Sequence, residues 1–85
     1  MRVKVRITLQ LKRQVWFVDS YHVDSADGGQ FLVLPPLLKR KFFSHEAAVT
    51  YMQRMVRGRL KLLGHDVAGS EMTCDVHVLP PKETQ

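Results

Sequence analysis

The chain has 85 residues, 45% of them hydrophobic, and its thirteen Lys and Arg exceed its eight Asp and Glu to give a formal net charge of +5. This length predicts one small domain over residues 1–80, with residues 81–85 as a flexible C-terminal tail, and disfavours an enzyme with a deep pocket. The single Cys74 excludes an intramolecular disulfide, and no apolar run approaches the roughly 20 residues that span a bilayer. We therefore expect a cytoplasmic protein with no membrane partner.

The first predicted element is a strand that begins near the N-terminus. Hydrophobic residues alternate with polar ones from Val3 to Leu11, which is typical of a strand with one buried and one solvated face. A register slip by one residue would bury a row of cations, so the buried face is firmly set.

A second strand is predicted from Val15 to Val23, where aromatic and β-branched residues dominate. The connection has no Asn-Gly signal, so two loops are open. A loop of Lys12 and Arg13 places Trp16 opposite Leu9 in the core, whereas a loop of residues 12–14 places Trp16 among the arginines. The second arrangement also puts Asp19 on the apolar face, so we favour Trp16 facing inward.

Residues 24–29 are predicted to form a glycine-containing turn, and residues 30–34 a third strand that returns antiparallel until Pro35 and Pro36 end its pairing. Residues 39–43 either continue this strand with a bend or form a loop. We expect both Phe42 and Phe43 to anchor in the core.

An amphipathic helix is predicted next, with Ser44 as its N-cap and Gly64 as its C-cap. Its apolar stripe comprises Ala48, Met52, Met55, Val56, Leu60 and Leu63. Residues 72–78 alternate again and predict a last strand. The fold class is thus α+β, in the order β-β-β-α-β, with a mostly antiparallel sheet and one amphipathic helix packed on one face.

No residue pattern indicates catalysis, a metal or a cofactor. The four histidines and Cys74 lack the paired spacing of a zinc site, and Cys74 lies on the apolar side of its predicted strand without a nearby base. The serines have no triad context. We therefore expect no enzyme and no cofactor.

The basic residues carry the functional prediction, because they form three clusters from which acidic residues are absent. On a strand, Arg2, Lys4 and Arg6 would stand about 6.6 Å apart, a row suited to a phosphate backbone. The clusters predict a nucleic-acid-binding module, for DNA or RNA, with these contact residues: Arg2, Lys4, Arg6, Lys12 and Arg13; Lys39, Arg40 and Lys41; Arg54, Arg57 and Lys61.

The sequence leaves two alternatives, one for the interface and one for the function. Because the helix would cover one sheet face, the basic strand and the basic helix would face opposite sides, so either a sheet-face or a helix-face interface is expected.

The alternative function is a protein-interaction module: a homodimer, an inhibitor or a subunit that docks an acidic partner through a sheet edge or a basic face.

The stretch from Lys39 to Ala48 leads from basic residues through phenylalanine into a capped helix. Together with Trp16 and the turn at residues 27–29, it resembles the small DNA-binding domains, a three-stranded sheet plus a helix, at the N-termini of some phage-type integrases. The resemblance covers about residues 14–60 and implies that the sheet reads the major groove. The chain departs from that pattern at Pro35 and Pro36, in its long basic first strand and in its extra last strand, so we do not assign it to the family.

Overall fold

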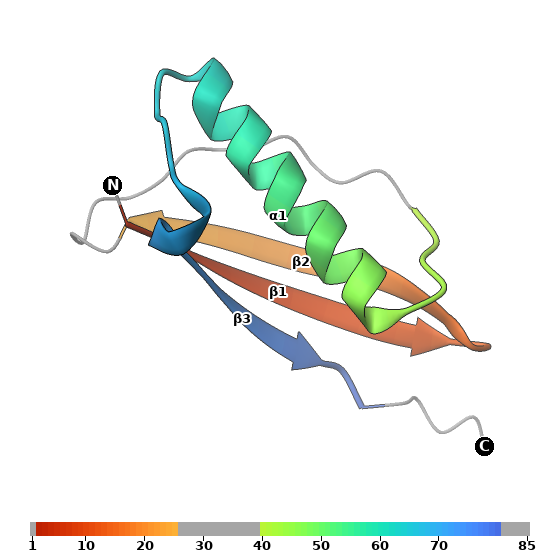
Figure 1. Cartoon of the computed structure of the whole chain (residues 1–85). Coiled ribbons are helices and arrows are strands. Elements are labelled where there is room, and N and C mark those ends of the chain that lie inside the picture. The colour runs from red at the N-terminus through yellow and green to blue at the C-terminus, as the bar shows by residue number, and fades with distance from the viewer. Residues whose placement is uncertain (1, 26–39, 81–85) are drawn as a thin grey trace.

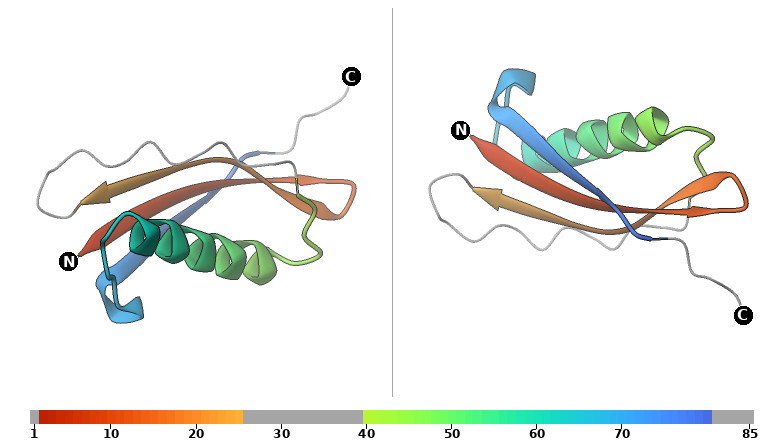
Figure 2. Two further views of the ribbon diagram at one scale, coloured as in Figure 1. Left: turned by 90° about the horizontal axis from the view of Figure 1, so that it is seen from above. Right: turned by 90° about the horizontal axis from the view of Figure 1, so that it is seen from below.

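The computed structural model of the chain describes residues 2–25 and 40–80. Its elements are β1 (Val3–Lys12), β2 (Val15–Ser25), α1 (His45–Leu62), a short 3-10 helix η1 (Gly69–Glu71) and β3 (Met72–Val78). β1 is the central strand; it pairs antiparallel with β2 and parallel with β3. Helix α1 lies across one face of this sheet, and no described element covers the other face, which we call the open face (Figures 1 and 2).

The predicted α+β class, a small single domain with one helix on a sheet, is confirmed. The described sheet is mixed, with one antiparallel and one parallel pair. The expected third strand at residues 30–34, most of the turn before it and the tail at residues 81–85 lie outside the described residues.

The alternation along β1 produces the core as predicted. Val3, Val5, Ile7 and Leu9 point toward α1 and are at most 2% exposed, while the polar residues between them face the open side. Leu11 is on the same side as Leu9 but is 43% exposed, so the buried part of β1 ends at Leu9.

The β1–β2 turn differs from both predicted loops. Lys12 pairs with Val15, which leaves Arg13 and Gln14 as the two turn residues, both with positive φ (49° and 65°). That conformation matches the right-handed twist of a hairpin and favours Asn and Gly, whose absence here hid the turn.

A bulge in β2 explains why its inward face was ambiguous. Thr8 pairs with Ser20 but Leu9 pairs with Val18, so Asp19 is an extra residue without a partner on β1. Because of this extra residue, Tyr21, three residues after Val18, lies on the same side of the sheet as Trp16 and Val18. All three side chains pack against the core. The prediction that Trp16 faces inward is confirmed.

The segment before the helix is joined to the sheet through Trp16. Phe42 and Trp16 exchange two backbone hydrogen bonds, of 2.8 and 2.9 Å, in an antiparallel bridge. Phe42 is 7% exposed, as expected of a core anchor, but Phe43 is 88% exposed. The prediction that Phe43 is a core anchor is therefore wrong, because consecutive residues of an extended segment point to opposite sides.

The predicted N-cap Ser44 is present, and the C-cap is Leu63, one residue before the predicted C-cap Gly64. The Ser44 hydroxyl accepts a hydrogen bond from the Ala47 N–H (3.0 Å), and Gly64 has φ 88°. The Gly64 N–H donates to the Lys61 carbonyl (3.0 Å) and the His65 N–H to the Leu60 carbonyl (2.8 Å), which is a Schellman ending.

The helix stripe is buried at Ala48, Met52, Val56 and Leu60, as predicted. Met55 is half-buried and packs at the edge of the core, whereas Leu63 is exposed, because it lies at the C-cap beyond the sheet. Within the described ranges, no helix is both long and apolar enough to cross a membrane.

Candidate nucleic-acid interface

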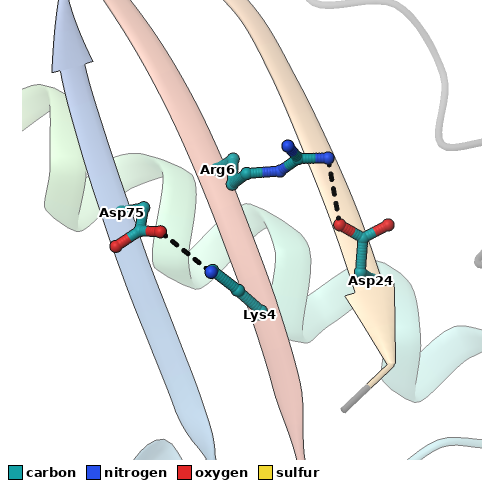
Figure 3. Close-up of polar contacts among 4 residues, drawn as sticks. All are labelled: Lys4, Arg6, Asp24 and Asp75. Atoms are coloured by element: carbon teal, nitrogen blue, oxygen red, sulfur yellow. Dashed lines mark hydrogen bonds and ion pairs between the residues drawn. The ribbon is translucent and has the colours of Figure 1, made fainter. Parts of the chain in front are cut away.

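The predicted row of cations on β1 is present on the open face of the sheet, where Arg2, Lys4 and Arg6 are exposed. Two of the three are ion-paired with carboxylates on the neighbouring strands. Lys4 Nζ lies 3.1 Å from Asp75 of β3, and Arg6 lies 3.3 Å from Asp24 of β2 (Figure 3). The row is therefore flanked by a carboxylate on each side.

These two ion pairs are exposed, so each contributes little to stability. Their effect on binding is larger, because a phosphate that approaches Lys4 or Arg6 also approaches Asp24 or Asp75. Sequence reasoning missed this compensation, since it depends on which strands flank β1.

A shallow hollow of about 340 Å³ lies on the same face, and its lining includes Arg6, Thr8, His22, Asp75 and His77. His22 is directly opposite Arg6 across the β1–β2 ladder, so its side chain lies beside the row of cations. The Asp75 carboxylate belongs to the same hollow, which therefore has mixed charge.

The basic residues of α1 form the second candidate surface. Arg54, Arg57 and Lys61 are exposed, but the Arg57 Nε donates to the Val67 carbonyl (3.3 Å) and so holds the chain that follows the helix. Arg54 and Lys61 form no ion pair with another described residue. Lys61 lies in the last turn, where a cation also complements the helix dipole. Among the described residues, this surface thus offers two cations without an ion-pair partner.

A third surface, which we call the basic end, consists of Lys12, Arg13, Arg40 and Lys41. The Trp16–Phe42 bridge places the segment 40–43 beside the start of β2, and Lys12 pairs with Val15 one residue before Trp16. Parts of two sequence clusters therefore meet at the hairpin end of the sheet, next to the start of α1 (Figure 1). Lys39 of the same prediction lies outside the described residues.

The basic end differs from the sheet row in its electrostatics. Lys12, Arg13 and Lys41 are exposed, and none of them forms an ion pair with another described residue. Glu46 lies nearby in the first turn of α1, where its charge complements the positive end of the helix dipole. Positive charge is therefore in excess here.

Aromatic rings position one of these cations. The Arg40 guanidinium carbon lies 4.4 Å from the centre of the Tyr51 ring and 5.7 Å from that of Phe42. Stacking occupies the face of a guanidinium and leaves its N–H edge available to an anion. Phe43 adds an exposed ring beside Lys41.

Other candidate groups do not assemble into a site in the described part of the chain. No group of three or more His, Cys, Asp or Glu side chains there is arranged to hold a metal ion. Cys74 is half-buried, and its sulfur accepts a hydrogen bond from the Gln53 amide (3.4 Å).

Comparison with known protein families, with characterised proteins and with solved structures finds no match to this chain. The resemblance to integrase domains thus remains an expectation from a few residues. The resemblance implies an interface on the sheet, and this is the face on which Asp24 and Asp75 flank the cations.

Proposed function

We propose that the chain is a small nucleic-acid-binding module that holds a single strand at its basic end. The observation that carries the proposal is Phe43, an 88% exposed ring that lies two residues after Lys41, at the end of the sheet where Lys12 and Arg13 project. The cations would contact phosphates, and the ring would stack on a base.

The dimensions of the basic end support this assignment. Because Val15 separates Phe43 from Lys12 across two strand spacings, the backbones of Phe43 and Lys12 are on the order of 10 Å apart. A nucleic-acid strand that crosses the edge of the sheet at this point meets cations on both sides of the Phe43 ring. Combinations of cations with exposed aromatic rings are typical of single-strand binding without strict sequence preference.

A single strand fits better than a duplex. A base stacks on a protein ring only when it is not already stacked on both sides within a helix, so the role of Phe43 favours unpaired DNA or RNA. The charge pattern favours contact through phosphates, which is weakened by salt because counterions are released on binding.

The proposal is tested by fluorescence anisotropy with labelled single-stranded and double-stranded oligonucleotides, between about 50 and about 300 mM salt. We expect single strands to bind more tightly, with affinity falling steeply as salt rises. Absence of salt-dependent binding to any strand would contradict the proposal, and tighter binding to duplexes would contradict the stacking role.

Substitutions at Phe43 separate stacking from simple hydrophobic contact. Phe43→Trp keeps an aromatic surface and should retain the affinity, whereas Phe43→Leu should weaken binding by about 5- to 100-fold. Equal affinities for the two variants would show that Phe43 does not stack on a base. Neither change removes core contacts, since Phe43 is exposed.

A further inference from the structure

β3 is an edge strand with few of the features that usually prevent edge-to-edge pairing. In the described part of the chain its one neighbour is β1, and its seven residues, Met72–Val78, include no Lys and no Pro. Val76 and Val78 lie on the helix side of the sheet and are 36% and 41% exposed. Such an edge offers unpaired backbone groups beside apolar surface.

The hydrogen bonding between β3 and β1 shows which backbone groups of β3 do not bond to β1. The Leu79 N–H donates to the Leu9 carbonyl (2.8 Å), so Leu79 turns its backbone groups toward β1. Because backbone direction alternates along a strand, His77 and Asp75 also bond to β1. The N–H and C=O groups of Cys74, Val76 and Val78 therefore point away from the sheet.

We propose that two copies of the chain pair through this edge, with their β3 strands antiparallel about a two-fold axis at Val76. Val76 then exchanges backbone hydrogen bonds with Val76 of the second copy, and Cys74 pairs with Val78 in the same way. The exposed valines pack against each other on the helix side. The two sheets join into one continuous sheet.

Side-chain complementarity selects this register. With the axis at Val76, the Asp75 carboxylate lies opposite the His77 imidazole of the second copy, and the contact occurs twice because the interface is symmetric. An axis at Asp75 instead places two carboxylates opposite each other, which is destabilising. An axis at His77 sets Asp75 opposite Leu79, so the carboxylate gains no polar partner from the second copy.

The inferred dimer does not depend on nucleic-acid binding. Its interface lies on β3, whereas the basic end lies at the β1–β2 turn and the segment before α1. Failure of one proposal therefore leaves the other to its own test.

Sedimentation velocity of the purified chain, from about 1 µM to about 1 mM, tests the association. We expect a concentration-dependent shift from monomer to dimer, and a monomer over the whole range would overturn the proposal. Val76→Pro removes an outward N–H that β1 does not use, so it should preserve the fold and weaken dimerisation at least about 10-fold.

Val76→Thr is the matched control, because it keeps the N–H and the β-branched shape. Circular dichroism confirms that each variant is folded. Equal dimerisation of the Pro and Thr variants would overturn β3 as the interface.

Substitutions at His77 test the register with the fold unchanged, since His77 is exposed. His77→Lys places a cation opposite Asp75 of the second copy and should retain the dimer. His77→Glu places a carboxylate there and should weaken dimerisation by about 10-fold relative to His77→Lys. Equal dissociation constants for these two variants would overturn the proposed register.

Discussion

At the scale of single residues, the extended segment before α1 assigns opposite roles to two neighbours. Phe42 packs in the core, with its ring centre 5.3 Å from that of Tyr51, and Phe43 projects into solvent. Sequence reasoning treated the two rings alike, although alternation in an extended segment allows only one of them to face the core. That alternation predicts one surface ring, and the Trp16–Phe42 bridge makes Phe43 that ring.

Leu9 and Leu11 give a matched test of the core, since both point to the helix side of β1 and differ in burial. Leu9 is 0% exposed and Leu11 is 43% exposed. We expect Leu9→Ala to lower the free energy of unfolding by about 2–5 kcal/mol and Leu11→Ala by less than about 1 kcal/mol. Urea denaturation of both variants measures the difference, and equal losses would contradict the position at which the core ends.

Tyr21 makes stability depend on pH in alkaline solution. Partial burial raises the pKa of the Tyr21 phenol above its ordinary value, and the nearby positive charge of Arg59 opposes this in part. The folded state thus holds the phenol proton more tightly than the unfolded state. The protonated Tyr21 therefore contributes to the free energy of unfolding in full below about pH 10, and this contribution is lost as the pH rises through the folded pKa.

Removal of the Tyr21 hydroxyl should therefore make the free energy of unfolding depend less on pH in alkaline solution. We expect Tyr21→Phe to lose less stability than the unmodified chain between about pH 9 and pH 11. Urea denaturation at a series of pH values measures this, with the difference at pH 7 subtracted as the control. Parallel profiles for the two proteins would contradict the effect of burial on Tyr21.

At the scale of elements, local chemistry determined what could be predicted. β1, α1 with its two caps, and the last strand follow from alternation, the apolar stripe, Ser44 and Gly64. The β2 register could not be derived, because the bulge at Asp19 moves the inward positions from even to odd numbers. The parallel β1–β3 pairing is non-local, so it has no short-range signal in the sequence.

The β1–β2 turn predicts a stabilising substitution. Gln14 has φ 65°, a conformation that costs residues with a Cβ roughly 1 kcal/mol and costs glycine little. Gln14→Gly should therefore raise the free energy of unfolding by about 0.5–1 kcal/mol. Gln10→Gly, inside β1, should lower the free energy of unfolding, since glycine weakens a strand interior. Thermal denaturation compares them, and destabilisation by Gln14→Gly would contradict the turn geometry.

At the scale of the whole molecule, the distribution of the charge matters more than its sum. The sequence identified most of the candidate cations but could not rank them. Their partners come from other strands: Asp24 and Asp75 compensate Arg6 and Lys4, and the Trp16–Phe42 bridge brings Lys41 to the end that carries Lys12. The interface that we propose is therefore neither of the two opposed basic faces expected from the sequence, but a third surface at the hairpin end.

The salt dependence of single-strand binding, compared between two variants of equal charge, tests the central claim most directly. Lys12→Gln with Lys41→Gln removes two cations from the basic end, and Arg54→Gln with Lys61→Gln removes two from the outer side of α1. If the strand lies at the basic end, the first pair should reduce the slope of log affinity against log salt by about 1.4, and the second should leave it nearly unchanged. A larger reduction by the helix pair, or equal reductions by both, would contradict the account.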